Sequence, residues 1–435
     1  MMDARQVALQ ALLLVDRGSW LDKAVRDVVP EEAAAADRRL AHNLAYGVTS
    51  NELTLDYILN RFCRKGINSL SPVLRIILRI GLYQLMYLDR VPDYAVLNEA
   101  AAQARKHAGP AMAGLVNGVL RNVLRSRETL LSDLPREVNK RISVEFSHPL
   151  WIVDHWLERW GEKFTRELCL ANNQPAPLSL RVNTEKTSKE SLLAMLADCD
   201  IDARPSKWDP NMLVLPAETA FSQLPAHDQG LFSIMGESSA LPVQNLGLTA
   251  GLEVLDMCSA PGGKAVYAAE LVRPATVTAI EIHSHRATSI VETARRLGLD
   301  NVAVITGDAR DAKELTARSF PRILLDAPCS GSGVLRKKPD IKWRYSEKDI
   351  KKLVLLQKQL LAAACNLLEP GGFVVYSTCS LLRWENEEVV EGALAAEDMV
   401  ALPVSIGGEE LRYGNIFPSV HGIDGFFLAK LQKVV

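Results

Sequence analysis

The spacing of apolar residues divides the chain into three segments of different periodicity. Over residues 1–135 apolar residues recur every three or four positions, which predicts helices throughout and no strand alternation. Ser71 and Pro72 mark the expected start of one helix, because proline is well tolerated in a first helical turn. The apolar positions that follow them are Val73, Leu74, Ile76, Ile77 and Ile80. We therefore expect an all-α domain over residues 1–135.

Residues 136–245 follow a less regular pattern. Trp151, Trp156 and Trp160 are spaced by five and four positions, which places them on one helix face and favours a buried stripe over a base-stacking surface. Residues 178–184, Leu-Ser-Leu-Arg-Val-Asn-Thr, predict a strand that leads into a turn. We expect a small α+β linker domain over residues 136–245.

From Leu252 onward short apolar runs alternate with helical stretches, which is typical of a doubly wound parallel sheet. The predicted strands are residues 252–255, 277–280, 302–305, 323–325 and 373–376. A polar residue lies at each strand end: Asp256, Glu281, Asp308, Asp326 and Ser377. Such sheets bind ligands at the carboxyl ends of their strands. Residues 246–435 are therefore predicted to form a Rossmann-like α/β catalytic domain with its site at this edge.

Composition limits the class of protein. A chain of 435 residues with 48% apolar residues is globular and exceeds what one core usually serves. A net charge of -2 argues against a protein that binds nucleic acid through an overall positive charge. Any contact with nucleic acid would then be made by local clusters of basic residues. The alternative is that these residues are scattered, solvated surface charges. The clusters are Arg61, Arg64, Lys65, Arg105, Lys106, His107, Arg121, Arg125 and Arg127. The seven cysteines show neither disulfide nor zinc-ligand spacing, which favours a reducing compartment and no bound metal. The sequence also shows no signal peptide and no apolar run long enough to span a membrane, so we expect a cytoplasmic protein.

The first strand of the predicted sheet is followed by a turn that opens a helix, Cys258-Ser259-Ala260-Pro261-Gly262-Gly263-Lys264. This turn is not the Gly-x-Gly-x-x-Gly of dinucleotide sites and leaves less room for a pyrophosphate. Glu281 follows about twenty residues later, where an acid accepts hydrogen bonds from ribose hydroxyls. Asp308 would reach an adenine, and Arg286 and Asp326 are assigned to the same site. These residues predict S-adenosylmethionine as the cofactor.

Cys329 and Cys379 occur in the similar tripeptides Pro-Cys-Ser and Thr-Cys-Ser, after the fourth and fifth predicted strands. Carbon 5 of cytosine becomes nucleophilic only after a thiolate adds to carbon 6. A pair of strand-end cysteines beside a cofactor turn therefore favours this chemistry over two inert buried thiols. Lys264 is a candidate for lowering a thiol pKa, and Asp326 for binding the base edge near nitrogen 3.

A basic segment, Arg336–Arg344, follows the first of these cysteines and contains one tryptophan. Such a segment can hold phosphates while its aromatic ring stacks on a base, as enzymes that act on extruded bases require. The alternative is an ordinary surface loop.

Taken together, these motifs resemble those of the bacterial 16S ribosomal RNA cytosine carbon-5 methyltransferases of the RsmB (Sun/Fmu) type. The resemblance spans nearly the whole chain and is carried by residues 326–333, 378–380, 338–343 and 424–430, together with a helical start similar to a NusB-type RNA-binding domain at 98–100 and 116–120. It implies that Cys379 is the nucleophile, that Cys329 assists elimination, and that cytosine 967 is the target. The turn 258–264, Glu281, Asp308 and Asp326 would line the methyl-donor site. Two departures are Glu281, usually Asp, and Met235-Gly236, commonly Gln-Asp.

We therefore expect methylation of one cytidine in 16S ribosomal RNA, free or in a partly assembled small subunit, by a monomer that binds neither metal nor membrane. The same chemistry on transfer RNA is an alternative, against which the NusB-like start weighs. A non-catalytic RNA-binding or assembly factor is another, against which the intact Cys329, Cys379, Lys264 and Asp326 argue. A DNA methyltransferase would attack with the cysteine of the Pro-Cys block and need no Thr-Cys-Ser partner.

Overall fold

The computed structural model describes residues 3–30, 32–217, 219, 224–395 and 398–434. The chain forms two compact units, Met1–Gln174 with Leu335–Arg344 and Pro175–Val334 with Tyr345–Val435. The first unit thus includes a segment from the second half of the chain, which periodicity alone did not indicate. Within the described ranges, no helix combines the length and the apolar character needed to cross a bilayer.

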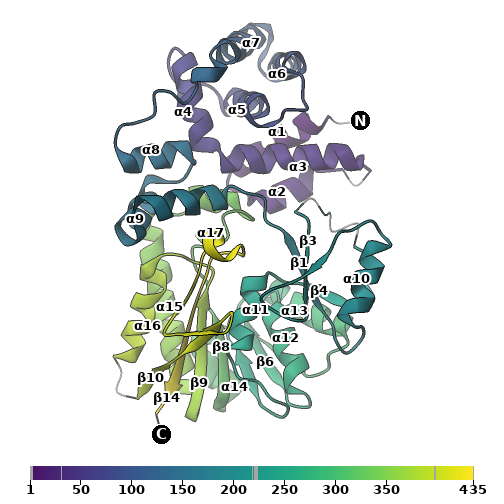
Figure 1. The fold of residues 1–435 in the computed structure, drawn as a ribbon, viewed down its shortest axis with the longest axis vertical. Helices are drawn as coiled ribbons and strands as arrows, with labels where there is room; N and C mark the ends of the chain where they lie inside the picture. Colours follow the sequence, from purple (N-terminus) through teal and green to yellow (C-terminus); the bar gives the residue numbers. More distant parts are fainter. Residues whose placement is uncertain (1–2, 31, 218, 220–223, 396–397, 435) are drawn as a thin grey trace. The chain divides into compact units, whose positions relative to one another are not determined.

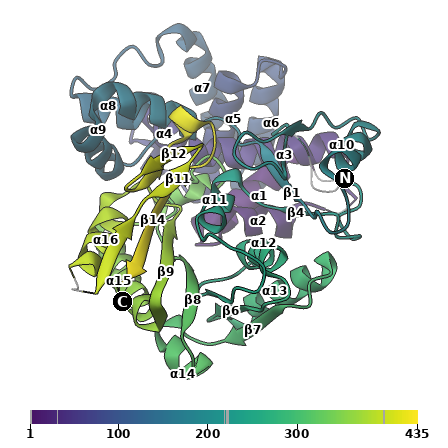
Figure 2. The ribbon, with the colours of Figure 1, turned by 60° about the horizontal axis from the view of Figure 1, so that its bottom comes forward.

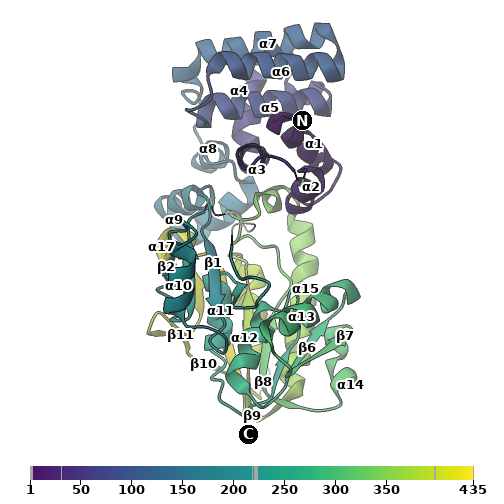
Figure 3. The same ribbon diagram turned by 90° about the vertical axis from the view of Figure 1, so that its right-hand side faces the viewer.

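The first unit is helical, as expected. Its helix α5 (Pro72–Tyr87) is buried on nearly all sides by its neighbours α1, α3, α4, α6 and α7, and Figure 3 shows α5, α6 and α7 side by side. Helix α5 begins at Pro72 as predicted, although the Ser71 side chain makes no capping hydrogen bond. The other helices are α1 (Ala4–Asp16), α2 (Leu21–Val28), α3 (Ala35–Ser50), α4 (Glu52–Phe62), α6 (Asp93–Ala108), α7 (Pro110–Arg125), α8 (Val138–Glu145), α9 (Leu150–Asn172), and the 3₁₀ turns η1 (Ile67–Ser69) and η2 (Arg127–Thr129).

The three tryptophans expected on one helix all lie on α9, before the point where this helix breaks. Helix α9 breaks at Gly161, whose φ of 75° and ψ of 178° are not helical. Trp156 is fully buried and lies against the His148 ring, with ring centroids 5.8 Å apart. Trp151 and Trp160 are only half-buried. The core prediction is therefore confirmed for Trp156, while the other two are partly exposed.

The segment Leu335–Arg344 contains the 3₁₀ helix η5 (Pro339–Trp343) and contacts several helices of the first unit. The buried Asp340 carboxylate accepts a hydrogen bond from the backbone N–H of Leu21, at the start of α2, at 3.1 Å. The Arg344 guanidinium lies 4.0 Å from the centroid of the Trp20 ring and donates to Asp340 at 2.9 Å. This segment therefore supplies the missing hydrogen-bond acceptor at the first turn of α2.

Two residues of this segment, which the sequence predicted to hold phosphates and stack on a base, bond to other parts of the first unit. Lys342 Nζ is buried and donates to the Ser50 carbonyl at 2.9 Å and to Asn173 Oδ1 at 2.7 Å. The half-buried Trp343 donates its indole N–H to the Thr49 carbonyl at 2.8 Å. Burial lowers the pKa of Lys342 to about 7. The Lys342 ammonium therefore binds protein partners and does not hold a phosphate, which corrects the prediction for this residue of the segment. Base stacking by the half-buried Trp343 ring stays a prediction.

Replacing Lys342 with methionine is expected to flatten the pH dependence of stability. An unfolded lysine holds its proton up to about pH 10.5, whereas the buried ammonium releases it near pH 7. The unfolded state therefore binds more protons between these values, and the free energy of unfolding of the wild-type protein rises with pH across this window. Urea titrations at about pH 7 and about pH 9 measure this slope. Lys338→Met, at an exposed position in the same segment, should keep it. An unchanged slope in Lys342→Met would contradict the assignment.

The second unit contains a small antiparallel sheet with strand order β2-β3-β1-β4. The strand predicted over residues 178–184 is observed as β1 (Leu178–Val182). Helix α10 covers this sheet, and both contribute to one apolar core that includes Leu180, Leu196 and Phe232. The other elements are β2 (Arg204–Pro205), β3 (Met212–Leu215), β4 (Phe232–Ile234) and α10 (Lys189–Ala197).

In the described part of the chain, a larger sheet of eight strands has the order β10-β14-β9-β8-β5-β6-β7, with β13 paired to β14. All five predicted strands are present, and they are the five parallel ones: β5 (Val254–Asp256), β6 (Val277–Glu281), β7 (Val302–Thr306), β8 (Phe320–Asp326) and β9 (Leu368–Thr378). Figure 2 shows β9, β8, β6 and β7 in this order across the sheet, and β5 pairs with both β8 and β6. The strand order reverses between β5 and β8, so the ends of these strands are where a ligand is expected.

The sheet is mixed, which corrects the expectation of a purely parallel one. Strand β14 (Phe426–Lys433) pairs antiparallel with β9, and β10 (Met399–Leu402) and β13 (Gly414–Ile416) pair antiparallel with β14. The short strands β11 (Val404–Ile406) and β12 (Glu409–Leu411) form a hairpin of their own. Strands β14, β10 and β13 extend the larger sheet beyond β9, as Figure 1 shows for β10 and β14.

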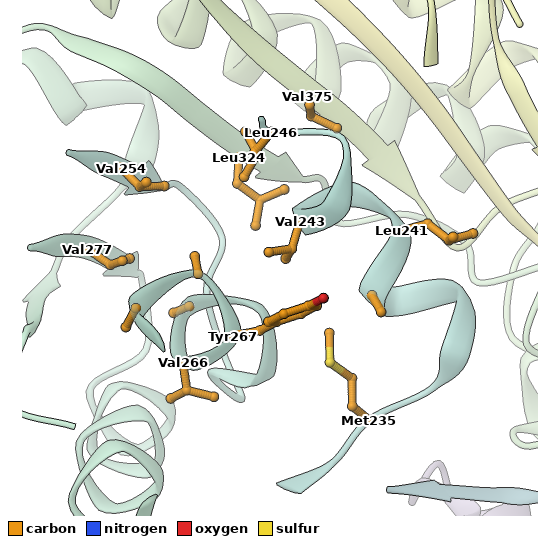
Figure 4. Close-up of a cluster of buried hydrophobic side chains, with 14 of the residues drawn as sticks. Met235, Leu241, Val243, Leu246, Val254, Val266, Tyr267, Val277, Leu324 and Val375 are labelled. Atoms are coloured by element: carbon orange, nitrogen blue, oxygen red, sulfur yellow. The ribbon is translucent and has the colours of Figure 1, made fainter. Parts of the chain in front are cut away.

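Helices cover both faces of this sheet and create two apolar cores. One core includes residues of α11 and α12, and Figure 4 shows the Tyr267 ring of α12 between Val243 of α11 and Met235. The other core lies under α15 and α16, with Leu361 and Val390 among its members. The helices of this unit are α11 (Glu237–Gln244), α12 (Gly263–Val272), α13 (Ser284–Leu297), α14 (Ala312–Thr316), α15 (Glu347–Leu367), α16 (Glu387–Leu394) and α17 (Pro418–His421), with the 3₁₀ turns η4 (Ala309–Asp311) and η6 (Arg383–Glu385).

A buried ion pair joins the small sheet to helix α12. Arg181 of β1 pairs with Glu270 through both carboxylate oxygens, and both side chains are less than 5% exposed. The Arg181 guanidinium also lies 4.0 Å from the Tyr267 ring centroid. Burial raises the pKa of Glu270 to about 7, even though Arg181 lowers it. Desolvation therefore outweighs the attraction within this pair.

Candidate active site

The predicted cofactor turn joins β5 to α12. Its backbone is held against β6 by the Ser259 N–H, which donates to the Ile280 carbonyl at 3.0 Å. Gly262 adopts the left-handed conformation, with φ 102°, and a Cβ there would lie 3.2 Å from Ile290 Cα. Glycine is therefore required at this position both by its conformation and by the closeness of α13. Helix α12 begins at Gly263, so its amino end points back to the turn.

The acids predicted at the ends of β6 and β7 lie beside this turn. Glu281 is buried, accepts the His283 N–H at 3.0 Å, and lies 3.6 Å from a guanidinium nitrogen of Arg286. Arg286 also donates to the carbonyl of Ala260 at 3.1 Å, which connects it to the cofactor turn. Gly307, which precedes Asp308, donates its N–H to the Glu281 carbonyl at 3.1 Å. Glu281, Arg286 and the turn therefore form one connected group.

Asp308 is oriented by a neighbouring arginine. Its carboxylate accepts hydrogen bonds from the Arg310 side chain at 2.6–3.1 Å and from the Arg310 backbone N–H at 2.9 Å. The side-chain hydrogen bond from Arg310 is the main reason that the pKa of Asp308 lies below its ordinary value. Asp308 is therefore ionised at neutral pH.

Four strand-end carboxylates surround Cys258. Burial raises the pKa of the Cys258 thiol above its ordinary range, and the negative charges of Asp256, Asp326, Glu281 and Asp308 raise it further, in that order. Burial also raises the pKa of Asp256 to about 7. The turn is therefore lined by acids that can accept hydrogen bonds from a ligand.

Lys264 and Asp326 form a charged pair between the turn and the end of β8. Lys264 Nζ donates to Asp326 Oδ2 at 2.6 Å, and the Ser377 hydroxyl donates to Asp326 Oδ1 at 2.9 Å. Burial alone would lower the pKa of Lys264, but Asp326 more than offsets this, with smaller contributions from Asp256 and Cys379, so its pKa is raised. Lys264 is therefore a fixed positive charge whose surroundings include the Cys379 sulfur.

The two cysteines of the similar tripeptides lie together, with their Sγ atoms 3.3 Å apart. Cys379 follows β9, and its carbonyl accepts the Gly333 N–H at 2.9 Å. The hydrogen bond with Cys379 raises the pKa of Cys329 well above its ordinary value, and burial raises it further. A Cβ on Gly333 would lie 2.2 Å from the Gly425 carbonyl oxygen, so two glycines let the segments at 329–333 and 424–425 approach.

Sequence reasoning missed the residue that connects the two cysteine segments. Glu385 of η6 is fully buried, and its carboxylate accepts hydrogen bonds from the hydroxyls of Ser330 and Ser380, the residues that follow the two cysteines. The repeated Cys-Ser pair, with an acid five residues after the second one, was the available signal. Among the described residues, no group of three or more histidines, cysteines or acids could hold a metal ion.

Three family models match the chain. Residues 243–432 match the model described as 16S rRNA methyltransferase RsmB/F, and residues 2–125 match the NusB family. Residues 148–222 match the ferredoxin-like domain of RsmF/B-like methyltransferases. Together with the observed helical, small mixed and large α/β parts, these matches confirm the predicted fold class.

Curated relatives are similar over their full length. The chain is 34% identical to a probable ribosomal RNA small subunit methyltransferase B of Bacillus subtilis, covering 99% of this chain and 98% of the relative. It is 35% identical to ribosomal RNA small subunit methyltransferase B of Pasteurella multocida, covering 100% and 97%.

Solved structures show the same fold. The crystal structure of PH0851 superposes with a TM-score of 0.84 at 23% identity, covering 100% of this chain and 99% of that one. A methyltransferase homolog protein from Pyrococcus horikoshii superposes with a TM-score of 0.61 at 31% identity, covering 69% of this chain and 100% of that one.

Proposed function

The chain belongs to the RsmB/F family of 16S rRNA methyltransferases, and from this we propose that it methylates carbon 5 of one cytidine of 16S rRNA through a covalent cysteine intermediate. The observation that carries the proposal is the 3.3 Å separation of the Cys329 and Cys379 sulfurs, beside the charged pair of Lys264 and Asp326. Carbon-5 methylation of cytosine needs a nucleophile for carbon 6, and these cysteines lie at the strand ends where a ligand binds.

We infer that S-adenosylmethionine is the methyl donor. The acid-rich surroundings of the turn at 258–264 fit its cationic sulfonium and amino groups. The Glu281 carboxylate can accept hydrogen bonds from the ribose hydroxyls. Arg286 holds Glu281 and the turn in place through its contacts with both. Asp308 would contact the adenine. When bound, this cofactor supplies an electrophilic methyl group.

Addition begins at Cys379. Its thiolate forms a bond from Sγ to carbon 6 of the base, and the displaced electron pair makes carbon 5 an enamine carbon that can take the methyl group. Asp326 binds the base edge near nitrogen 3, while Lys264 holds the Asp326 carboxylate by its bond of 2.6 Å. Asp326 therefore orients the base by accepting a hydrogen bond from its amino group beside nitrogen 3, and the positive charge of Lys264 offsets the negative charge that the attack places on the base.

Elimination returns the enzyme to its starting state. A base takes the proton from carbon 5, the carbon 5–carbon 6 double bond forms again, and the carbon 6–sulfur bond breaks with its electrons on Cys379. Cys329 lies 3.3 Å from this sulfur, and its raised pKa keeps it as a thiol. Its S–H can then hydrogen-bond to the departing thiolate, which makes Cys379 a better leaving group.

The substrate assignment is tested by transfer of a labelled methyl group from S-adenosylmethionine to unmodified 16S rRNA and, in parallel, to bulk transfer RNA. We expect the label at carbon 5 of one cytosine of 16S rRNA, with cytosine 967 as the position to examine first. Small-subunit particles at partial assembly serve as a third substrate and separate free RNA from assembled RNA. Label on transfer RNA alone would overturn the substrate, and no label on any of the three would overturn the proposed activity.

A further inference from the structure

The buried Glu385 carboxylate accepts hydrogen bonds from neutral donors, three of them in the cysteine segments and one on helix α15. Its Oε1 accepts the Ser330 backbone N–H at 2.8 Å and Gln357 Nε2 at 3.0 Å. Its Oε2 accepts the hydroxyls of Ser330 and Ser380, both at 2.5 Å. Burying a carboxylate is costly unless it is well hydrogen-bonded, so these four bonds indicate a site built around this charge.

The carboxylate also fixes the direction of the hydroxyl groups around it. A serine hydroxyl has one hydrogen, and Ser380 donates it to Glu385. The Ser380 oxygen is then left to accept the Leu382 N–H and the Ser332 hydroxyl, each at 3.1 Å. Ser332 in turn accepts the Leu381 N–H at 2.8 Å. Each hydroxyl in this network therefore donates in one fixed direction, and this arrangement requires that residue 385 act only as an acceptor.

The two cysteines depend on Glu385 to different degrees. Cys379 directly follows β9, whose last residue Thr378 is paired with β14, so its backbone is fixed by the sheet. Cys329 lies in an irregular segment after β8. The peptide groups on its two sides are held by Gln357, which donates to the Pro328 carbonyl at 2.9 Å, and by Glu385. Loss of the Glu385 carboxylate should therefore release Cys329 more than Cys379.

We propose that Glu385, supported by Gln357, is a positioning residue that holds Cys329 against the Cys379 sulfur for the elimination step. This inference rests on the proposed function, in which Cys379 adds to the base and Cys329 assists its release. Glu385 also helps to keep Cys329 protonated, as elimination requires. Its negative charge is one of the smaller causes of the raised pKa of Cys329, after the hydrogen bond with Cys379 and burial.

The test compares Glu385→Gln with Cys329→Ala, using the full chain and 16S rRNA. A glutamine side chain accepts through one atom and donates through the other, so it cannot accept four bonds. We expect turnover to fall about 10- to 100-fold without a rise in KM for RNA, because a misplacement of about 1 Å has effects of this size and the slowed step follows RNA binding. A denaturant-resistant protein–RNA adduct should accumulate, as it should in Cys329→Ala. In the Cys329→Ala background, Glu385→Gln should leave the rate of adduct formation unchanged.

Two further variants keep the result interpretable. Glu388→Gln removes an exposed carboxylate in the next helix and should behave as wild type. Ser330→Ala removes one donor without creating a buried amide, so it should show the same accumulation to a smaller extent even if Glu385→Gln does not fold. Wild-type turnover in both Glu385→Gln and Ser330→Ala would overturn the inference, as would joint loss of turnover and adduct in folded Glu385→Gln. If Cys329→Ala itself formed no adduct, the proposed roles of the cysteines would fail and this inference with them.

Discussion

Cys379→Ala is expected to lower methyl transfer to 16S rRNA by about four orders of magnitude or more, because removal of a catalytic nucleophile typically has effects of this size. The variant should also form no covalent adduct, since the neighbouring Cys329 has a raised pKa that keeps it as a thiol, and a thiol is a poor nucleophile for carbon 6. Cys329→Ala should give the opposite pattern. Addition and methyl transfer proceed through Cys379, elimination stalls, and protein stays attached to RNA in denaturing gels.

The exposed Cys199 provides the control for this pair, and Cys199→Ala should match the wild-type protein in both assays. The cysteine assignment would be reversed if Cys329→Ala lost the adduct and Cys379→Ala accumulated it. Normal turnover by Cys379→Ala would exclude covalent catalysis by this residue altogether. Both variants should fold normally, because each side chain is only half-buried and alanine removes a single sulfur atom.

Arg181→Met is expected to lower the free energy of unfolding of the second unit by roughly 3–5 kcal/mol, the usual effect of removing one partner of a buried ion pair. The variant leaves the Glu270 carboxylate buried without its counter-ion and removes the guanidinium from the Tyr267 ring. The double variant Arg181→Met/Glu270→Leu should recover most of this loss, because apolar side chains of similar volume replace such pairs at little cost.

Urea titrations of the wild-type protein and these variants measure the effect. Lys352→Met removes one partner of an exposed pair with Asp349 on α15 and should change stability by less than about 1 kcal/mol. The pKa of Glu270 is about 7, so its carboxylate is charged at alkaline pH, and the titrations are made there. A loss of less than about 1 kcal/mol for Arg181→Met at alkaline pH would contradict the prediction.

The parallel strands and the cofactor turn could be predicted because their signals are local. Each of the five strands is a short apolar run, and the residues at their ends are read directly from the sequence. The antiparallel strand β14 follows several short elements, and its pairing with β9 joins positions some fifty residues apart, which periodicity does not report. The sequence therefore predicted the half of the sheet that builds the cofactor side and missed the mixed edge.

The positions of charged side chains were harder to predict, because the sequence does not show whether a charged residue faces water or is buried in the protein. Lys342 was expected at a phosphate and instead donates to Ser50 and Asn173 inside the first unit. Glu385 received no role, although it joins the segments that carry both cysteines. In both cases the partners are distant in sequence, so only the three-dimensional structure reveals that these charges are internal.

The inclusion of residues 335–344 in the first unit has a consequence for the order in which the protein can be completed. A ribosome synthesises Met1–Gln174 early, yet the residues that accept the Leu21 N–H and stack on Trp20 are made only after β8. Domains usually fold in order of synthesis. Here the amino-terminal unit must wait, with the start of α2 incomplete, until most of the chain has been translated. A fragment that ends at Gln174 lacks part of its own structure, however well its helices form.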